Sequence, residues 1–161
     1  HPTSFASDRF SAHYLTNIIG NPLDTTVAMH YLIFGGVLER YPDLKFVLSH
    51  GGAFAAAYAG RMDHAYGARP DCRENISMPP SFYLEKFYPD SLVFTIEQLQ
   101  YLINRFGADH VLIGTDYPFD MGEYDPVEHV YQVPGLSSAN RDLICGGNAL
   151  RLMHMTEDEC K

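Results

Sequence analysis

Short apolar segments alternate with longer helical patterns along this chain, and this alternation limits the folds that it can adopt. A helical pattern over residues 24–40 precedes the apolar segment LKFVLSH at 44–50, and a second pattern over 95–107 precedes VLIG at 111–114. Neither segment alternates with polar residues, as expected for parallel strands that are covered on both faces. The order therefore predicts an α/β protein whose parallel sheet has about three strands.

The remaining segments fit the same interpretation. An Ala-rich helix is expected over 53–68, a short helix over 82–87 and a weak strand over 88–94. Short helices are expected after Pro126, with Ser137 or Ser138 and Asn148 as caps.

Composition narrows the protein class. The 161 residues are 46% hydrophobic, which favours a single globular domain over 1–161. The net charge of −9 argues against nucleic acid or an anionic membrane surface as partner, and favours small molecules or proteins. Neither an apolar stretch of about 18 residues nor a signal peptide is visible, and three widely spaced cysteines fit reduced thiols. We therefore expect a soluble, cytoplasmic protein.

Two polar residues follow the predicted strands. His50 comes after FVLS and Asp116 comes after LIGT. A (β/α) barrel places its active site at these carboxyl ends of strands, and the chain lacks the glycine-rich motifs of dinucleotide and phosphate sites. The pattern therefore indicates consecutive barrel units with chemistry at His50 and Asp116.

Three short phrases carry a family resemblance: HP at His1, SHGGAF at His50 and GTDYPF at Asp116. Together with GGNALRLM near residue 153, they resemble the aminocarboxymuconate-semialdehyde decarboxylase-like branch of the amidohydrolase superfamily. The resemblance implies the C-terminal part of an amidohydrolase-type (β/α)8 TIM barrel, truncated before strand five ends. Strands one to four and the H-x-H metal-binding pair of that family are absent from this sequence, and a complete barrel needs about 250 residues.

The resemblance also implies roles for individual residues. His1 and Asp116 correspond to ligands of a divalent metal, usually zinc, and His50 to the acid/base that acts with the metal-bound water. Arg61, on the helix after HGG, corresponds to a clamp for the substrate carboxylate, often offered across a homodimer interface. Phe54 and Phe119 are candidate apolar walls for the substrate.

The implied activity is metal-dependent, nonhydrolytic decarboxylation of a small unsaturated or aromatic carboxylic acid, with Asp116 and His50 as catalytic residues. Two alternatives stay open. One is a metal-dependent hydrolase or hydratase with a similar site, and the other is an inactive half-barrel that pairs with a partner, such as the missing barrel half.

Each candidate residue also has a simpler interpretation. Asp116 is equally a turn carboxylate that caps backbone amides, and His50 a structural histidine at a strand end. Arg61 is otherwise a surface charge on a helix, and His1 a terminal residue facing solvent. The six other histidines have no metal-ligand spacing and are assigned to the surface or the core.

Overall fold

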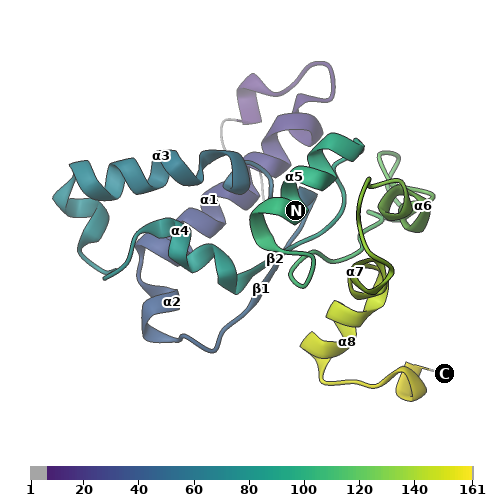
Figure 1. Cartoon of the computed structure of the whole chain (residues 1–161). Coiled ribbons are helices and arrows are strands. Elements are labelled where there is room, and N and C mark those ends of the chain that lie inside the picture. The colour runs from purple at the N-terminus through teal and green to yellow at the C-terminus, as the bar shows by residue number, and fades with distance from the viewer. Residues whose placement is uncertain (1–6, 161) are drawn as a thin grey trace. The chain divides into compact units, whose positions relative to one another are not determined.

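The computed structural model describes residues 7–160, so the predicted ligand His1 lies outside the described residues. The chain divides into two compact units, the first ending at Phe87 and the second beginning at Tyr88. Figure 1 labels the helices and strands of both units. None of the helices within residues 7–160 combines the length and the hydropathy that a membrane crossing requires.

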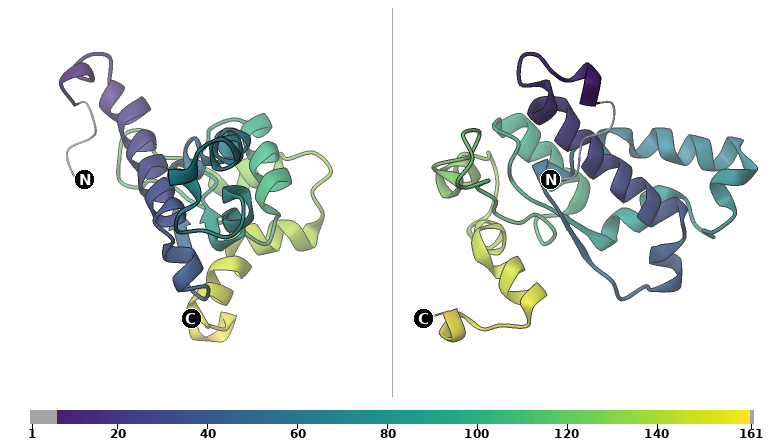
Figure 2. Two further views of the ribbon diagram at one scale, coloured as in Figure 1. Left: turned by 90° about the vertical axis from the view of Figure 1, so that its left-hand side faces the viewer. Right: turned by 180° about the vertical axis from the view of Figure 1, so that it is seen from behind.

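The first unit is mostly helical. A π-helical turn at Thr16–Gly20 leads directly into α1, and Figure 2 shows the two as one continuous rod. The helices are α1 (Asn21–Phe34), α2 (Val37–Arg40), α3 (Ala55–Ala68) and α4 (Pro80–Tyr83). Shorter 3-10 turns lie at Ser7–Arg9, His50–Gly52, Pro70–Arg73 and Leu84–Lys86.

The helix predicted over residues 24–40 is interrupted. It begins earlier, at Asn21, and ends at Phe34, and α2 starts only at Val37. The cause is Gly36, whose φ of 69° lies in the left-handed region that glycine tolerates and other residues rarely adopt. A Cβ atom at Gly36 would lie 2.5 Å from the Asn75 carbonyl oxygen, so the close approach also requires glycine. Helical periodicity gave no sign of this break.

Two strands are present, β1 (Phe46–Leu48) and β2 (Phe87–Pro89), and they form a two-stranded sheet. The ring of Phe87, the last residue of the first unit, packs against that of Phe46 with 5.9 Å between the ring centroids. The strand predicted within 44–50 is confirmed, although it has only three residues. The strand predicted over 88–94 is confirmed only at its start, because β2 ends at Pro89 and residues 91–94 form no strand. The prediction of a third strand at 111–114 is wrong.

The 111–114 segment makes a single parallel bridge, between Leu112 and Asp90. The amide of Leu112 donates to the Pro89 carbonyl at 2.9 Å, whereas that of Ile113 donates to the Ile144 carbonyl at 3.0 Å. Because neighbouring amides bond in different directions to different elements, no continuous ladder forms. The described chain is therefore a helix-rich α/β protein with a small sheet.

The second unit continues from β2 into helices. They are α5 (Ile96–Phe106), α6 (Pro126–Tyr131), α7 (Ser138–Asp142) and α8 (Asn148–Met153), with a π turn at Leu143–Gly147 and a 3-10 turn at Glu157–Cys160. Thr95 and Ser137 cap α5 and α7 by accepting bonds from the amides of Gln98 and Asn140. The prediction of Ser137 as a cap is confirmed.

Asn148 is a buried clamp and not the predicted helix cap. Its side chain is fully buried, and the amide nitrogen donates to the carbonyls of Ala108 and Val111 at 2.8 and 2.7 Å. A buried amide of this kind must find partners, and here it finds them in the turn that precedes residues 111–114. Asn148 therefore ties the start of α8 to the segment that leads to Asp116.

Candidate active site

His50 lies at the end of β1, in an unusual stretch of backbone. His50, Gly51, Gly52 and Ala53 have consecutive positive φ angles of 58°, 61°, 69° and 54°. Glycine adopts this region without strain, but a residue with a Cβ atom pays roughly 1–2 kcal/mol there. Backbone strain of this kind concentrates at functional sites, where surrounding structure holds it in place. The strain at His50 and Ala53 therefore marks this strand end as a candidate site.

One hydrogen bond indicates which ring nitrogen of His50 carries the proton. The Thr25 hydroxyl of α1 donates to the Asn21 carbonyl at 3.2 Å and lies 3.4 Å from Nδ1 of His50. Because its proton is engaged with Asn21, the hydroxyl can only accept from His50, so we assign the proton of the neutral ring to Nδ1. Nε2 then carries the lone pair and is the atom that can take up a proton.

Arg61 and Phe54 lie together on one groove, between α1 and α3, with a volume of about 470 Å³. Its lining is largely apolar, and includes Tyr58 of α3 and His30 of α1. The His30 ring packs 4.3 Å from that of Phe34, and desolvation lowers the pKa of His30.

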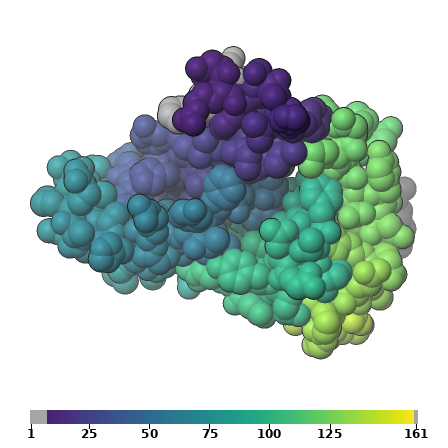
Figure 3. Space-filling model, turned by 90° about the horizontal axis from the view of Figure 1, so that it is seen from above, coloured from purple at the N-terminus to yellow at the C-terminus, as the bar shows by residue number. Residues whose placement is uncertain are grey.

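Among the described residues, the Arg61 guanidinium has no hydrogen bond or ion pair. Arg61 is therefore free to bind an anion. Figure 3 shows the surface over this part of the first unit, in purple to blue.

Asp116 lies in a tight loop that follows residues 111–114. Its φ of 54° is left-handed, a conformation that Asp adopts more readily than most residues. Thr115, and not Asp116, accepts the bond from the Tyr117 amide, at 3.2 Å. The Asp116 carboxylate has no partner among residues 7–160, so the turn-capping interpretation is wrong. Phe119 donates its amide to the Asp116 carbonyl at 2.9 Å, and its ring is exposed.

The predicted site residues belong to different units. His50, Phe54 and Arg61 are in the first unit, and Asp116 and Phe119 are in the second. The structure brings Phe54 and Arg61 to one groove, whose lining does not include His50, and it places Asp116 and Phe119 in one loop. No cluster of three metal-binding side chains occurs within the described range 7–160.

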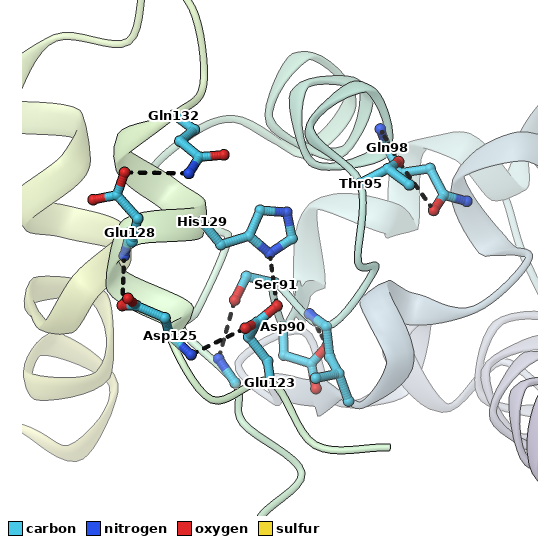
Figure 4. Close-up of polar contacts among 11 residues, drawn as sticks. Asp90, Ser91, Thr95, Gln98, Glu123, Asp125, Glu128, His129 and Gln132 are labelled. Carbon is cyan, nitrogen blue, oxygen red and sulfur yellow. Dashed lines mark hydrogen bonds and ion pairs between the residues drawn. The ribbon is translucent and has the colours of Figure 1, made fainter. Parts of the chain in front are cut away.

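Two groups of polar residues went unnoticed in the sequence. Thr25 lies within the helical pattern predicted over 24–40, which gives no sign that its hydroxyl contacts His50. In the second unit, Ser91, Glu123 and His129 surround the segment that leads to Asp116: Ser91 Oγ accepts from the Gly114 amide at 3.2 Å, and His129 Nδ1 lies 3.5 Å from Glu123 Oε2 (Figure 4). The only sequence signal was Glu123 in the loop that follows Asp116.

The comparisons with known proteins identify the family of this chain. The sequence profile of the amidohydrolase family matches residues 10–154. The chain is 37% identical over 155 residues to a 2-amino-3-carboxymuconate-6-semialdehyde decarboxylase of Dictyostelium discoideum, a match that covers 95% of this chain and 43% of the relative.

Two solved structures share the fold at 25% identity. The 5-carboxyvanillate decarboxylase of Sphingomonas paucimobilis superposes with a TM-score of 0.84, over 97% of this chain and 48% of that one. A dihydroxybenzoic acid decarboxylase of Polaromonas sp. JS666, solved with bound manganese and 2-nitroresorcinol, superposes with a TM-score of 0.78, over 93% of this chain and 47% of that one.

These alignments cover nearly all of this chain but less than half of each matched protein. Nearly the whole chain aligns, yet it spans less than half the length of the Dictyostelium relative. The family profile alone covers residues 10–154, which include His50 and Asp116. The chain therefore belongs to the amidohydrolase family and to its aminocarboxymuconate-semialdehyde decarboxylase-like branch.

Proposed function

We propose that this chain is the C-terminal part of a (β/α)8 barrel that catalyses the metal-dependent, nonhydrolytic decarboxylation of a small unsaturated or aromatic carboxylic acid. Relatives of this chain and its solved structural neighbours carry decarboxylase names, and their substrates are acids of this size. The observation that carries the proposal is the His50 ring, whose Nδ1 is tied to Thr25 and whose Nε2 is left to exchange protons.

Decarboxylation needs one proton for each turnover. The C–C bond to the carboxylate breaks, carbon dioxide leaves, and the carbon that carried it gains a hydrogen. His50 is suited to supply that hydrogen, because a ring held in one tautomer presents one nitrogen in a fixed direction. Nε2 takes a proton from solvent and delivers it to the substrate carbon, and the neutral ring is then regenerated.

Arg61 is the proposed partner of the substrate carboxylate. Its guanidinium is unpaired within the described chain and projects from α3, the helix that follows the HGG sequence. A guanidinium can bind a carboxylate through two parallel hydrogen bonds, which orients the acid. The apolar rings of Phe54 and Phe119 are proposed to contact the hydrocarbon part of the substrate.

A divalent metal fits the chemistry of Asp116. The half-buried carboxylate of Asp116 has no hydrogen-bond or ion-pair partner among residues 7–160, so it is available to bind a cation. We propose Asp116 and His1 as ligands; a bound divalent cation would act as a Lewis acid near the reacting carboxylate. The family resemblance favours zinc as this metal, and manganese is the metal bound in the Polaromonas decarboxylase.

We further propose that the α1–α3 groove is covered by a second copy of the chain or by the missing part of the barrel. Val27, Tyr31 and Tyr58 expose 37%, 71% and 53% of their surface on these two helices. Exposed apolar side chains around an apolar groove favour burial against a protein surface. A pairing of this kind would also bring Arg61 close to a neighbouring subunit.

The test is an assay of carbon dioxide release by the complete protein with aminocarboxymuconate semialdehyde, 5-carboxyvanillate and dihydroxybenzoic acid. We expect release from one of these acids, loss of activity on dialysis against a chelator, and recovery with Mn²⁺ or Zn²⁺. His50→Ala should lower kcat by at least about 100-fold, the usual scale of general acid–base catalysis. His64→Ala, on the exposed face of α3, is the matched control.

Two results would contradict the proposal. Full activity of His50→Ala would remove His50 from the mechanism. Consumption of a lactone or an alkene without carbon dioxide would instead identify a hydrolase or a hydratase that uses the same site.

A further inference from the structure

We propose that Glu123 and His129 form a latch that positions Asp116. The Asp116 loop is residues 115–123, and the latch is the pair of side chains that fastens the end of this loop to α6. The inference rests on the proposed role of Asp116 as a metal ligand, and it assigns His129 as a positioning residue.

The Asp116 loop is closed by backbone bonds. The Glu123 amide donates to the Thr115 carbonyl at 2.8 Å, so the last residue of the loop is bonded to the first. Inside the loop, the Phe119 amide donates to the Asp116 carbonyl and the Gly122 amide to the Phe119 carbonyl, at 2.9 and 3.0 Å. A Cβ atom at Gly122 would lie only 3.0 Å from the Thr115 carbonyl oxygen, so the loop is tightly packed on itself.

The carboxylate of Glu123 ties this closed loop to the start of α6. One oxygen, Oε1, accepts from the Asp125 amide at 3.0 Å, and the other, Oε2, lies 3.5 Å from Nδ1 of His129. His129 is in α6 and only 8% exposed, and both of its ring nitrogens are buried without a hydrogen-bond partner, so the 3.5 Å approach to Glu123 is an ion-pair contact and not a hydrogen bond. Figure 4 shows the Glu123 carboxylate between His129 of α6 and Asp125, the residue that caps this helix.

Loss of the contact with Glu123 would leave both buried ring nitrogens of His129 without a polar partner among residues 7–160, so the contact favours keeping the end of the loop in place. Asp116 needs such support, because no described side chain forms a hydrogen bond or ion pair with its carboxylate and its φ of 54° is left-handed. The position of the carboxylate is therefore set by the backbone of the loop, and the latch holds that backbone at Glu123. Groups that orient metal ligands in this indirect way commonly affect metal affinity 10–100-fold.

Isosteric variants of His129 separate this role from simple packing. The side-chain amide of Asn lies where Nδ1 lies in His, and that of Gln lies where Nε2 lies. We expect His129→Asn to keep a donor for Glu123, whereas His129→Gln and His129→Leu lose it. Amide hydrogen exchange measured by NMR on the 161-residue chain should show faster exchange at Gly122 and Glu123 in the Gln and Leu variants. It should stay near wild type in the Asn variant, and Leu102 in α5 serves as the internal control.

The second readout is the affinity of the complete protein for Mn²⁺. We expect His129→Leu and His129→Gln to raise the Kd for Mn²⁺ at least about tenfold, and His129→Asn to restore it. Unchanged exchange at Gly122 and Glu123 in both the Leu and Gln variants would overturn the latch. Faster exchange with unchanged Mn²⁺ affinity would overturn its positioning role. Asp116→Asn tests the proposed function separately, because unchanged Mn²⁺ affinity there would remove Asp116 as a ligand whatever the latch does.

Discussion

A single hydroxyl sets the orientation of the candidate acid/base. Thr25 reaches Nδ1 of His50 from α1, while its own proton is held by the Asn21 carbonyl. We predict that Thr25→Val, which keeps the side-chain shape, leaves the ring with a mixture of tautomers. ¹⁵N NMR of the imidazole nitrogens should detect that mixture. Decarboxylation by the complete protein should slow about tenfold, which corresponds to about 1.4 kcal/mol of lost transition-state stabilisation.

Thr16→Val is the matched control for this experiment. Its hydroxyl also donates to a backbone carbonyl, that of Phe10 at 3.0 Å, but it does not contact His50. A His50 ring that stays in one tautomer in Thr25→Val would show that other contacts orient it. An equal loss of rate in Thr16→Val would show that the effect comes from helix packing.

Residues that act through their neighbours were the ones that sequence could not identify. His50 and Asp116 were predicted as site residues because a polar residue directly after an apolar segment is a local signal. Thr25 lies 25 positions before the ring that it contacts, and no local pattern links the two. His129 was assigned to the surface or the core. It is indeed buried, but its contact with Glu123 depends on a loop that closes through backbone bonds.

At the level of elements, strong local signals gave accurate predictions. The helix expected over 95–107 is observed as α5, because Thr95 caps its start and Gly107 ends it with a φ of 91°. The Ala-rich helix ends at Ala68, just before Pro70, as expected. The prediction of a strand at 111–114 was wrong because apolar composition does not specify hydrogen-bond partners. Here the partners of neighbouring amides lie in two different elements. The break in the helix at Gly36 was not predicted, because the close approach of Gly36 to Asn75 is a long-range contact.

The break between α1 and α2 can be tested with two glycine substitutions of opposite effect. Gly36→Ala places a Cβ atom at φ 69° and 2.5 Å from a backbone oxygen, so we expect a loss of more than about 1 kcal/mol in unfolding free energy. Gly60→Ala in α3 meets nothing within 4 Å, so we expect a gain of roughly 0.5–1 kcal/mol. Urea unfolding followed by circular dichroism measures both. Equal stability of Gly36→Ala and wild type would mean that the break is not fixed by this residue.

At the level of the whole molecule, the family could be predicted from the sequence more completely than the architecture could. The three phrases at His1, His50 and Asp116 pointed to the amidohydrolase family, and the profile match over 10–154 confirms it. The arrangement of a complete site was beyond prediction, because His50 and Asp116 belong to separate compact units and the chain spans less than half of its Dictyostelium relative. The division into units is a property of long-range contacts that local patterns do not encode.

The α1–α3 groove gives the last prediction, which concerns assembly. Tyr58 lines the groove, is 53% exposed and lies one helical turn before Arg61, so burial against a partner would remove a large apolar surface from water. We predict that the chain self-associates, or binds the missing barrel part, through this groove. Tyr58→Lys should raise the dissociation constant at least about tenfold, since tyrosine is a frequent hot-spot residue and the new charge cannot pair with Arg61.

Sedimentation equilibrium measures that dissociation constant directly. Tyr41→Lys is the control, because Tyr41 is similarly exposed, at 58%, but does not line the groove. If Tyr41→Lys weakened association as much as Tyr58→Lys, a general charge effect would explain both. If neither changed it, the groove would be left without a role in assembly, and Arg61 would have to reach any substrate from within its own subunit.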